Sequence, residues 1–412
     1  MANKLNVLVV SGDTGYPLRA SIRDSIYAFK YNSDCNSFFY FTEQGPFPEY
    51  LKKVNFDLVV FTDTWAGERW RGKEGLHKFV YKPLEYLKNL DVPKVVQPQD
   101  EWIFTDLLNE MINDFGITHV FSVAPSSEWK KIYNKVDHNK VKFHLVLTGY
   151  LEDSTVQKIN EIVSTVQKPK VDVGYRAYKA PPWLGSHGFL KTQIADIFNQ
   201  EAPKAGFSTD ISTSEKDTIT GNKWFEFMAG CKYFIGVEGG STVLDPDGQI
   251  FIKATAYQKE NPNASFEEFE KKFFPGMDGN LSLKAISPRH LEACATKTCQ
   301  VLIEGSYNEI LVPGRHYIEL KKDFSNLQEV FNKMKDEKLR EQIVKNAYED
   351  IVSSGKYSCL GYTKVVLENS LGQNTFSGKA GNSLGLLRNR LSEKRYWKKK
   401  AQSASEKQNA AA

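Results

Sequence analysis

A carboxylate stands one turn inside an expected helix start in the segment from Ile286 to Gly314. Ser287 and Pro288 are typical of the cap and first turn of a helix, and Glu292 follows them. The backbone N–H groups and positive dipole end of such a helix attract anions, and a carboxylate accepts hydrogen bonds from sugar hydroxyls. A nucleotide-sugar carries both kinds of group, so the segment predicts a site for this class of ligand.

The neighbouring elements place Glu292 at the edge of a sheet. Ala293 and Ala295 are small enough to let their helix pack closely, and the apolar run from Val301 to Ile303 is typical of a buried parallel strand. Ligands of open α/β sheets bind where the strands end. Glu292 is therefore expected near the mouth of an α/β sheet.

Short apolar runs alternate with helix-length segments through the first half of the chain. This rhythm predicts a parallel, doubly wound sheet. The expected strands are Leu5 to Val10, Ser37 to Phe41, Leu58 to Phe61, Lys94 to Gln97, His119 to Ser122 and Lys142 to Leu147. The expected helices include Ser21 to Lys30, Trp102 to Phe115 and Ser154 to Val166. A polar connector at Gln167 to Lys170 then ends the first domain, which we assign to residues 1–168.

A second α/β set is expected over residues 169–370. Its expected strands are Val171 to Gly174, Tyr233 to Val237, Val301 to Ile303 and Tyr317 to Leu320. Its expected helices are Phe189 to Asn199, Lys223 to Ala229, Pro288 to Ala295 and Leu327 to Met334. The last helices, Glu337 to Ile351 and Thr363 to Asn369, are candidates to pack back on the first domain.

Two segments stand apart from this α/β pattern. Residues 249–283 contain the charged pattern SFEEFEKKF, which is typical of a surface insertion and alternatively of an element that grips the acceptor. Residues 371–412 are expected to form a flexible linker, rich in Gly, Ser and Asn from Gly372 to Gly385, followed by a basic tail.

Several stretches of the chain resemble GT-B glycosyltransferases. Leu291-Glu292-Ala293 is similar to the donor-binding segment of the group 1 and spore-maturation-type (CgeB-like) families, found in bacterial O-antigen, lipopolysaccharide and capsule clusters. The other similar stretches are Phe56 to Trp70, Pro98 to Trp102, Val120 to Trp129, Leu147 to Asp153, Tyr175 to Gly188 and Phe234 to Gly248. Together they span most of residues 5–360. The resemblance implies two Rossmann-like, doubly wound parallel-sheet domains that face each other across a cleft.

The resemblance also implies roles for single residues. Glu292 would hold the ribose of the nucleotide, with Glu309 as the second acidic residue near the next loop. Arg176 and Lys179, after the first strand of the second domain, would neutralise the departing diphosphate, with Lys191 as the reserve candidate. The alternative for Arg176 and Lys179 is a pair of exposed basic residues in a loop.

The acidic residues depart from the group 1 spacing. Those enzymes usually carry two Glu residues eight positions apart, and the position eight before Glu292 is Lys284. Glu238 fills the missing role only if residues 249–283 are an insertion between the two halves of the motif. This departure concerns the catalytic centre and leaves the expected fold unchanged.

Further candidates flank these motifs. The donor side is completed by Ser287, Arg289, His290, Gly239 and Gly240. The alternative for His290 is a structural or solvated histidine, and the alternative for the two glycines is an ordinary tight turn. The acceptor side is expected to contain Gly15, Tyr16, Asp100, Glu101 and His187. A carboxylate after the strand Lys94 to Gln97 would orient the acceptor hydroxyl, so Asp100 is grouped with Arg176, Lys179 and Glu238 as catalytic; the alternative is an acid at a helix N-terminus.

Length and composition limit the classes of protein to which the chain can belong. A chain of 412 residues is expected to form two domains, and no run of about 18 apolar residues or signal peptide is present, so we expect a cytoplasmic protein. The five cysteines form no C-x-x-C pair, and the histidines lack close ligand spacing, so neither a disulfide framework nor a metal site is expected. The Gly12 to Pro17 loop is not G-x-G-x-x-G, which disfavours a dinucleotide cofactor.

Charge is concentrated in the tail. The net charge is +4, but residues 388–400 contain seven basic residues and one acidic residue, so residues 1–387 have no overall basic footprint for nucleic acid. Leucines and Trp397 alternate with these basic residues, which predicts a basic amphipathic helix and peripheral contact with the inner face of an anionic membrane. The alternative is a solvated tail or one module of a longer protein.

Taken together, the sequence predicts a glycosyltransferase that moves a sugar from a nucleotide-sugar to a bacterial surface glycan or its lipid-linked form. The group 1 resemblance favours retention at the anomeric carbon, with no metal or other cofactor. The alternatives are a catalytically silent GT-B protein that binds glycan or nucleotide, and a nucleotide-sugar epimerase of GT-B type.

Overall fold

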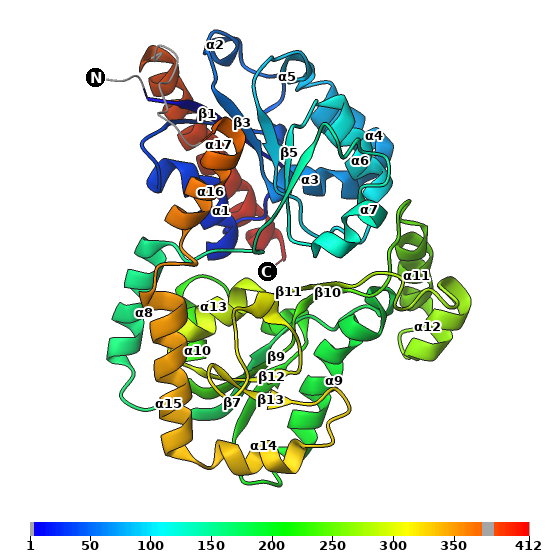
Figure 1. Cartoon of the computed structure of the whole chain (residues 1–412), viewed down its shortest axis with the longest axis vertical. Helices are drawn as coiled ribbons and strands as arrows, with labels where there is room; N and C mark the ends of the chain where they lie inside the picture. The colour runs from blue at the N-terminus through cyan, green and yellow to red at the C-terminus, as the bar shows by residue number, and fades with distance from the viewer. Residues whose placement is uncertain (1–3, 373–382, 412) are drawn as a thin grey trace. The chain divides into compact units, whose positions relative to one another are not determined.

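A computed structural model describes residues 4–372 and 383–411 of the chain. These residues form two compact units. Unit 1 takes the described residues of Met1–Val146 and Cys359–Ala412, and unit 2 is Leu147–Ser358 (Figure 1). The predicted boundary after Lys168 falls inside unit 2 in this division, because the helix before it packs against helices of unit 2.

Unit 1 is built on a six-stranded parallel sheet of order β2-β1-β3-β4-β5-β6. The strands are β1 (Asn6–Ser11), β2 (Asn36–Phe41), β3 (Leu58–Phe61), β4 (Lys94–Val96), β5 (His119–Ser122) and β6 (Lys142–Leu145). The helices are α1 (Ala20–Tyr31), α2 (Glu49–Lys52), α3 (Asp63–Gly67), α4 (Gly72–Leu76), α5 (Glu85–Lys88), α6 (Thr105–Asp114), α7 (Trp129–Ile132), α16 (Cys359–Leu371) and α17 (Ser383–Ala411). Strands β1 and β3 are wholly buried, as expected for apolar strands covered on both faces.

Unit 2 holds a five-stranded parallel sheet of order β13-β12-β9-β7-β8 and a two-stranded antiparallel ribbon, β10-β11. The strands are β7 (Val171–Arg176), β8 (Thr209–Ser212), β9 (Cys231–Gly236), β10 (Gly239–Ser241), β11 (Leu283–Ala285), β12 (Cys299–Ile303) and β13 (Tyr317–Leu320). The helices are α8 (Asp153–Thr165), α9 (Gly185–Glu201), α10 (Asn222–Ala229), α11 (Gln249–Glu260), α12 (Phe266–Phe273), α13 (Pro288–Ala295), α14 (Leu327–Met334) and α15 (Glu337–Ala347).

Short helical turns connect these elements. They are η1 (Thr42–Gln44), η2 (Glu68–Arg71), η3 (His77–Tyr81), η4 (Ser126–Glu128), η5 (Pro182–Leu184), η6 (Glu215–Asp217), η7 (Tyr307–Glu309) and η8 (Tyr348–Ser353). The two sheets confirm the predicted α/β class with two Rossmann-like parallel sheets. In each unit the parallel strands end at one edge of the sheet, and the loops that leave this edge carry most of the candidate residues.

The chain segment between strands β10 and β11 starts and ends at the two-stranded ribbon that these strands form. Strand β10 pairs with β11, with Gly240 opposite Lys284, so residues 242–282 form an excursion that begins and ends on this ribbon. Helices α11 and α12 of this excursion project together from unit 2 (Figure 1). The predicted insertion at about residues 249–283 falls largely within this excursion, and its status as an insertion stays a prediction.

The structure describes the expected basic tail but not most of the expected linker. Residues 373–382 of the expected linker lie outside the described residues. Residues 383–411 form α17, which packs on strand β2 of unit 1. Among the described helices, none combines the length and apolar character needed to span a membrane.

Candidate functional site

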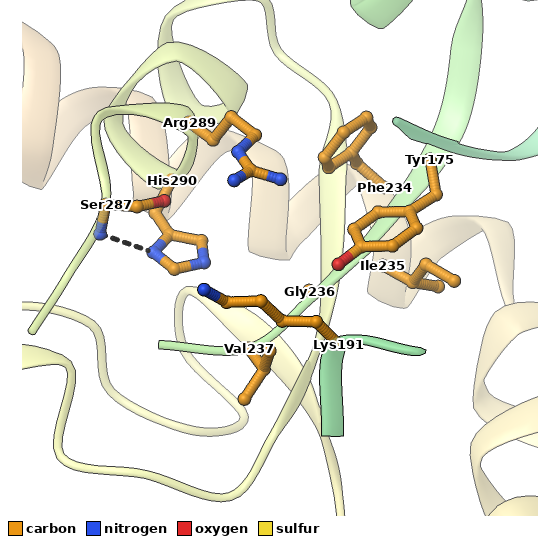
Figure 2. A pocket seen from close by; sticks show the side chains of 9 residues that line it. All are labelled: Tyr175, Lys191, Phe234, Ile235, Gly236, Val237, Ser287, Arg289 and His290. Atoms are coloured by element: carbon orange, nitrogen blue, oxygen red, sulfur yellow. Dashed lines mark hydrogen bonds between the residues drawn. The ribbon is translucent and has the colours of Figure 1, made fainter. Parts of the chain in front are cut away.

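A pocket lies at the edge of the unit 2 sheet where strand β9 ends and helix α13 begins. Figure 2 shows side chains from β7, α9, β9 and α13 around it. They are Tyr175, Lys191, Phe234, Ile235, Gly236, Val237, Ser287, Arg289 and His290. None of these residues is acidic, and two are cationic, so the lining favours an anion.

Two cations from different helices supply the charge of the pocket. Lys191 lies on α9, is 8% exposed, and points its ammonium toward His290 (Figure 2). Arg289 lies in the first turn of α13, and its Nη1 donates to the carbonyl oxygen of Arg176 at 3.1 Å. A buried ammonium and a guanidinium held by a backbone carbonyl are well placed to pair with phosphate oxygens.

His290 adds a neutral hydrogen-bond donor. Burial, with the nearby charges of Arg289 and Lys191, lowers the pKa of His290 to about 3, so the imidazole is neutral at pH 7. Its Nδ1 accepts from the backbone N–H of Ser287 at 3.1 Å. The proton of a neutral imidazole is then on Nε2, which lies near Gly236 in the pocket lining. His290 can therefore donate to an anion while it caps its own helix.

The start of α13 is fixed by two hydrogen bonds to Ile286. The hydroxyl of Thr148 donates to the carbonyl oxygen of Ile286, and the backbone N–H of Ile286 donates to Oδ1 of Asn308 at 2.7 Å. Ser287 at the cap and Pro288 at the first position match the sequence prediction for this helix. The N-terminal end of α13 is thus held beside the pocket rather than left to fray.

Glu238 holds the loop that carries Asn308. Three successive residues, Tyr307, Asn308 and Glu309, have φ values of 44°, 53° and 60°, which are costly for residues other than glycine. Glu238 is 1% exposed, and its Oε1 accepts from the backbone N–H of Tyr307 at 2.6 Å and from the hydroxyl of Ser306 at 3.0 Å. The structure thus gives Glu238 an anchoring task, and its expected catalytic role stays a prediction.

Glu292 lies beside the pocket on α13 and contacts an aromatic residue. Its Oε2 accepts from the indole N–H of Trp224 at 2.8 Å, and Trp224 packs edge-on against Phe234 of the lining. Trp224 was not singled out from the sequence, because an aromatic residue on an amphipathic helix is more often part of the core. Neither Glu292 nor Trp224 is part of the pocket lining, which Trp224 contacts through Phe234, so the ribose-binding role of Glu292 stays a prediction.

Arg176 and Lys179, the predicted diphosphate ligands, do not line the pocket. The Arg176 guanidinium pairs with Asp210 at 2.6 Å and lies 4.5 Å above the ring of Phe227. Lys179 is exposed in the loop after β7. Lys191, the reserve candidate, lines the pocket together with Arg289. The roles of Arg176 and Lys179 stay predictions, and their geometry favours structural and solvent-exposed positions.

The remaining candidates of unit 2 lie around the ribbon. Gly240 has φ of 124°, and a Cβ there would approach the carbonyl oxygen of Leu283 to 2.0 Å, so strand pairing requires this glycine. Gly239 is the first residue of β10. His187 is buried, and burial with the Lys191 and Lys284 charges lowers its pKa to about 4. Its Nε2 has no hydrogen-bond partner in the described structure.

In unit 1, Asp100 and Glu101 have opposite environments. Glu101 is fully buried and accepts from the backbone N–H groups of Val123 and Ala124 and from the hydroxyls of Ser122 and Tyr133. Burial raises the pKa of this carboxyl, and its partners leave little capacity for a substrate. Asp100 is exposed, with φ of 52°. Asp100 is therefore the better placed of the two to meet an acceptor.

Arg69 and Asp63 complete this edge and were not predicted. The buried Arg69 guanidinium donates to the carbonyl oxygens of Ile103, Ala66, Gln99 and Asp100, at 2.7 to 3.1 Å. Asp63 directly follows Thr62 after β3, and its buried Oδ1 has no hydrogen-bond partner among the described residues. Burial, with the nearby Asp100 charge, raises the pKa of Asp63 to about 6. In the sequence, the position of Asp63 directly after a predicted strand was the feature that could have identified it as a candidate.

The loop after β1 contains Gly15 and Tyr16, which are both exposed. Asp13 of this loop pairs with Arg71 at 2.9 Å and with Lys400 at 2.6 Å. The acceptor roles of Gly15 and Tyr16 stay predictions.

No cluster of three or more metal-binding side chains is present among the described residues. Asp245 in the D-P-D-G stretch accepts from the backbone N–H groups of Ile250 and Phe251, at 3.3 and 2.8 Å. This carboxylate therefore starts helix α11, which agrees with a turn at this position.

Comparison with known proteins identifies the fold. No protein-family model matches the sequence, and the search of curated proteins found no match. Among solved structures, the DNA-modifying enzyme β-glucosyltransferase, determined in the presence and absence of uridine diphosphoglucose, has a TM-score of 0.50 at 11% identity. That alignment covers 90% of this chain and 100% of the other. The T4 phage BGT in complex with UDP and Mn²⁺ gives the same TM-score and coverage at 12% identity.

The chain has the GT-B fold. A glycosyltransferase from Rickettsia africae is also similar, at 10% identity and a TM-score of 0.48, with 90% of this chain and 100% of the other covered. The GT-B fold accounts for two Rossmann-like parallel sheets in one chain. At these identities the similarity extends to the fold, so the function has to be argued from the pocket.

Proposed function

We propose that this protein is a glycosyltransferase that uses a nucleotide-sugar donor. The observation that carries the proposal is the pocket of unit 2, where Lys191, Arg289 and the N–H of His290 gather at the start of α13 with no acidic residue in the lining. A diphosphate presents several anionic oxygens in a small volume, and this set of donors matches it.

The groups beside the pocket suit the rest of a nucleotide. Glu292 offers a carboxylate to ribose hydroxyls, and the Trp224 indole that donates to it offers an aromatic surface to a base. The leaving diphosphate gains negative charge during glycosyl transfer, so fixed cations stabilise the transition state more than the ground state. Uracil is the first base to test, because the β-glucosyltransferase with the same fold was determined with uridine diphosphoglucose.

The finer parts of the proposal concern the acceptor and the stereochemistry. The resemblance of the sequence to surface-glycan enzymes supports a bacterial surface glycan or its lipid-linked form as the acceptor, in the cytoplasm at the inner face of the membrane. Retention at the anomeric carbon and catalysis without a metal belong to the same proposal. Asp100 is the candidate that would orient the acceptor hydroxyl from unit 1.

Isothermal titration of the full-length protein with UDP, UDP-glucose and the diphosphates of the other bases tests the donor. We expect one diphosphate to bind and Lys191→Met to weaken it, while Lys204→Met, which alters an exposed lysine that pairs with Glu201 and does not line the pocket, leaves it unchanged. Release of nucleoside diphosphate with an acceptor pool, repeated with EDTA, tests turnover and the absence of a metal. No binding of any nucleoside diphosphate would overturn the proposal.

A further inference from the structure

Helix α17 is fixed to unit 1 along one side. The Asn389 side chain, fully buried, accepts from the backbone N–H of Phe39 and donates to its carbonyl oxygen, both at 2.8 Å. Further along the helix, the Tyr396 ring stacks on Phe41 at 4.2 Å, and the Trp397 indole donates to Tyr27 at 2.6 Å. These contacts recur on one side of the helix, so α17 is a docked element with a defined inner and outer side.

The outer side of α17 exposes three leucines. Leu384, Leu387 and Leu391 are 58%, 55% and 49% exposed. Their spacing of three and four residues puts them on one face of an α-helix, away from the side that carries Asn389 and Tyr396. These three large apolar side chains are exposed, although the opposite side of the helix is packed on unit 1 through Asn389 and Tyr396.

Basic residues continue the same face. Arg388, Arg395 and Lys398 lie at helical spacing from the leucines and are exposed, with Lys394 and Lys399 at its margins. The nearby acidic residue, Glu393, points to the other side, where it pairs with Lys30 at 3.2 Å. From Leu384 to Lys398 the face therefore combines aliphatic side chains with positive charge that no acidic residue of the same face offsets, and the next acidic residue of the helix, Glu406, lies about two turns beyond Lys398.

We propose that this outer face of α17 docks on the surface of an anionic lipid bilayer. The leucines would enter the boundary between headgroups and acyl chains, and the basic residues would pair with anionic headgroups. A second copy of the same face would meet it with like charge, and a nucleic acid would leave the leucines in water, so the combination favours a bilayer. Trp397, expected from the sequence to face the membrane, is held by Tyr27 and stays on the protein side.

Docking in this manner needs no detachment of α17. The inner contacts at Asn389 and Tyr396 stay formed while the outer face meets the lipid. Unit 1 would then be held at the membrane in a fixed orientation rather than tethered by a loose tail. The proposal is independent of the donor site, since it concerns a different surface and requires no turnover.

Co-sedimentation of the full-length protein with vesicles, without nucleotide, tests the proposal. The vesicles are phosphatidylcholine alone or equal parts of phosphatidylcholine and phosphatidylglycerol. We expect pelleting with the anionic vesicles, little with the neutral ones, and loss of binding by at least about tenfold in Leu384→Ser/Leu387→Ser/Leu391→Ser. The matched control is Leu360→Ser/Val365→Ser, which removes exposed apolar side chains from α16 and should bind normally.

A second pair of variants tests the charge. Arg388→Gln/Arg395→Gln/Lys398→Gln should lose binding to anionic vesicles, while Lys140→Gln/Lys142→Gln/Lys158→Gln, exposed elsewhere, should not. Circular dichroism and an unchanged affinity for nucleoside diphosphate would show that each variant is folded. Normal pelleting of the leucine variant, equal binding to neutral vesicles, or a dimer that the leucine variant abolishes would overturn the proposal. So would tight binding of duplex DNA without binding to vesicles.

Discussion

The strand-end edges of the two sheets use buried charge in opposite ways. In unit 1 the buried cation, Arg69, gives its donors to backbone carbonyls, which leaves the carboxyl groups of Asp63 and Asp100 at that edge. In unit 2 the buried anion, Glu238, accepts from the loop at Ser306 and Tyr307, and the cations remain in the pocket lining.

In each unit, the buried charge that anchors a loop and the charges available to a ligand therefore have opposite signs. A buried charge whose partners are backbone groups fixes a loop, and removing it would leave those groups unpaired. The charges of the other sign are the ones placed to meet a ligand. Unit 2 is thereby suited to an anion such as a diphosphate, and unit 1 to hydroxyl groups or to proton transfer.

The largest expected effect is on the anchor of unit 2. Glu238→Ala removes the acceptor for Tyr307 and Ser306 and releases a loop with three positive φ values, so we expect the free energy of unfolding to fall by about 2–4 kcal/mol. Urea denaturation measures it, with Glu309→Ala, an exposed carboxylate of the same loop, as the control. Equal midpoints for the two variants would show that Glu238 is no anchor.

Next in size is the effect of a pocket cation. Arg289→Met removes a guanidinium from the lining, so the affinity for nucleoside diphosphate should fall by about 2 kcal/mol, close to thirtyfold. The control is Arg340→Met, whose guanidinium pairs with Glu337 away from the pocket. Titration calorimetry measures the affinity of both variants. A similar loss of affinity in both would show that the pocket does not bind the diphosphate.

The carboxyl group of Asp63 in unit 1 should make the free energy of unfolding depend on pH. Asp63 has a pKa of about 6 in the folded protein against an ordinary value of 3.8, so the folded state holds its proton more tightly than the unfolded chain. Stability contributed by this proton is present below about pH 4 and is lost as the pH rises to about 6. Asp63→Asn should remove this slope and raise stability near neutral pH by up to about 2 kcal/mol.

Urea denaturation across this pH window measures the effect. Asp137→Asn, which alters an exposed carboxylate of unit 1, is the control and should keep the wild-type slope. Parallel pH profiles for wild type and Asp63→Asn would show that Asp63 is not protonated in this window.

The smallest expected effect concerns Glu292 of unit 2. Glu292→Ala removes a carboxylate from beside the pocket and leaves the Trp224 indole without this acceptor, so affinity for nucleoside diphosphate should fall by about 1 kcal/mol. Glu226→Ala, an exposed carboxylate on α10, should leave the affinity unchanged. If both variants bind as the wild type does, Glu292 does not hold the ribose.

Much of this architecture could be predicted where a local pattern specified it. Ser287-Pro288 and a small-residue face gave the bounds of α13, and the apolar runs gave all six strands of unit 1. The strand β8 and the ribbon β10-β11 were missed, because they are short, polar or Gly-rich and depend on a partner for their structure.

The site was harder to predict because long side chains reach it from different elements. Arg176 and Lys179 were ranked ahead of Lys191 because they follow a strand and match the family resemblance. The structure shows that Lys191 is buried in the middle of α9, where a lysine usually faces solvent. The pairing of Arg176 with Asp210 across adjacent strands has no signature in the sequence. Burial and contacts, rather than residue type, distinguish a ligand from a structural cation here.

The most direct test of the central claim compares the nucleoside diphosphate with its free nucleoside in wild type and in Lys191→Met. If the pocket of unit 2 binds the diphosphate, the wild type should prefer the diphosphate to the nucleoside by at least about a hundredfold, and most of this preference should disappear in Lys191→Met. The same preference in both proteins, or equal affinity of the wild type for nucleoside and diphosphate, would contradict the account.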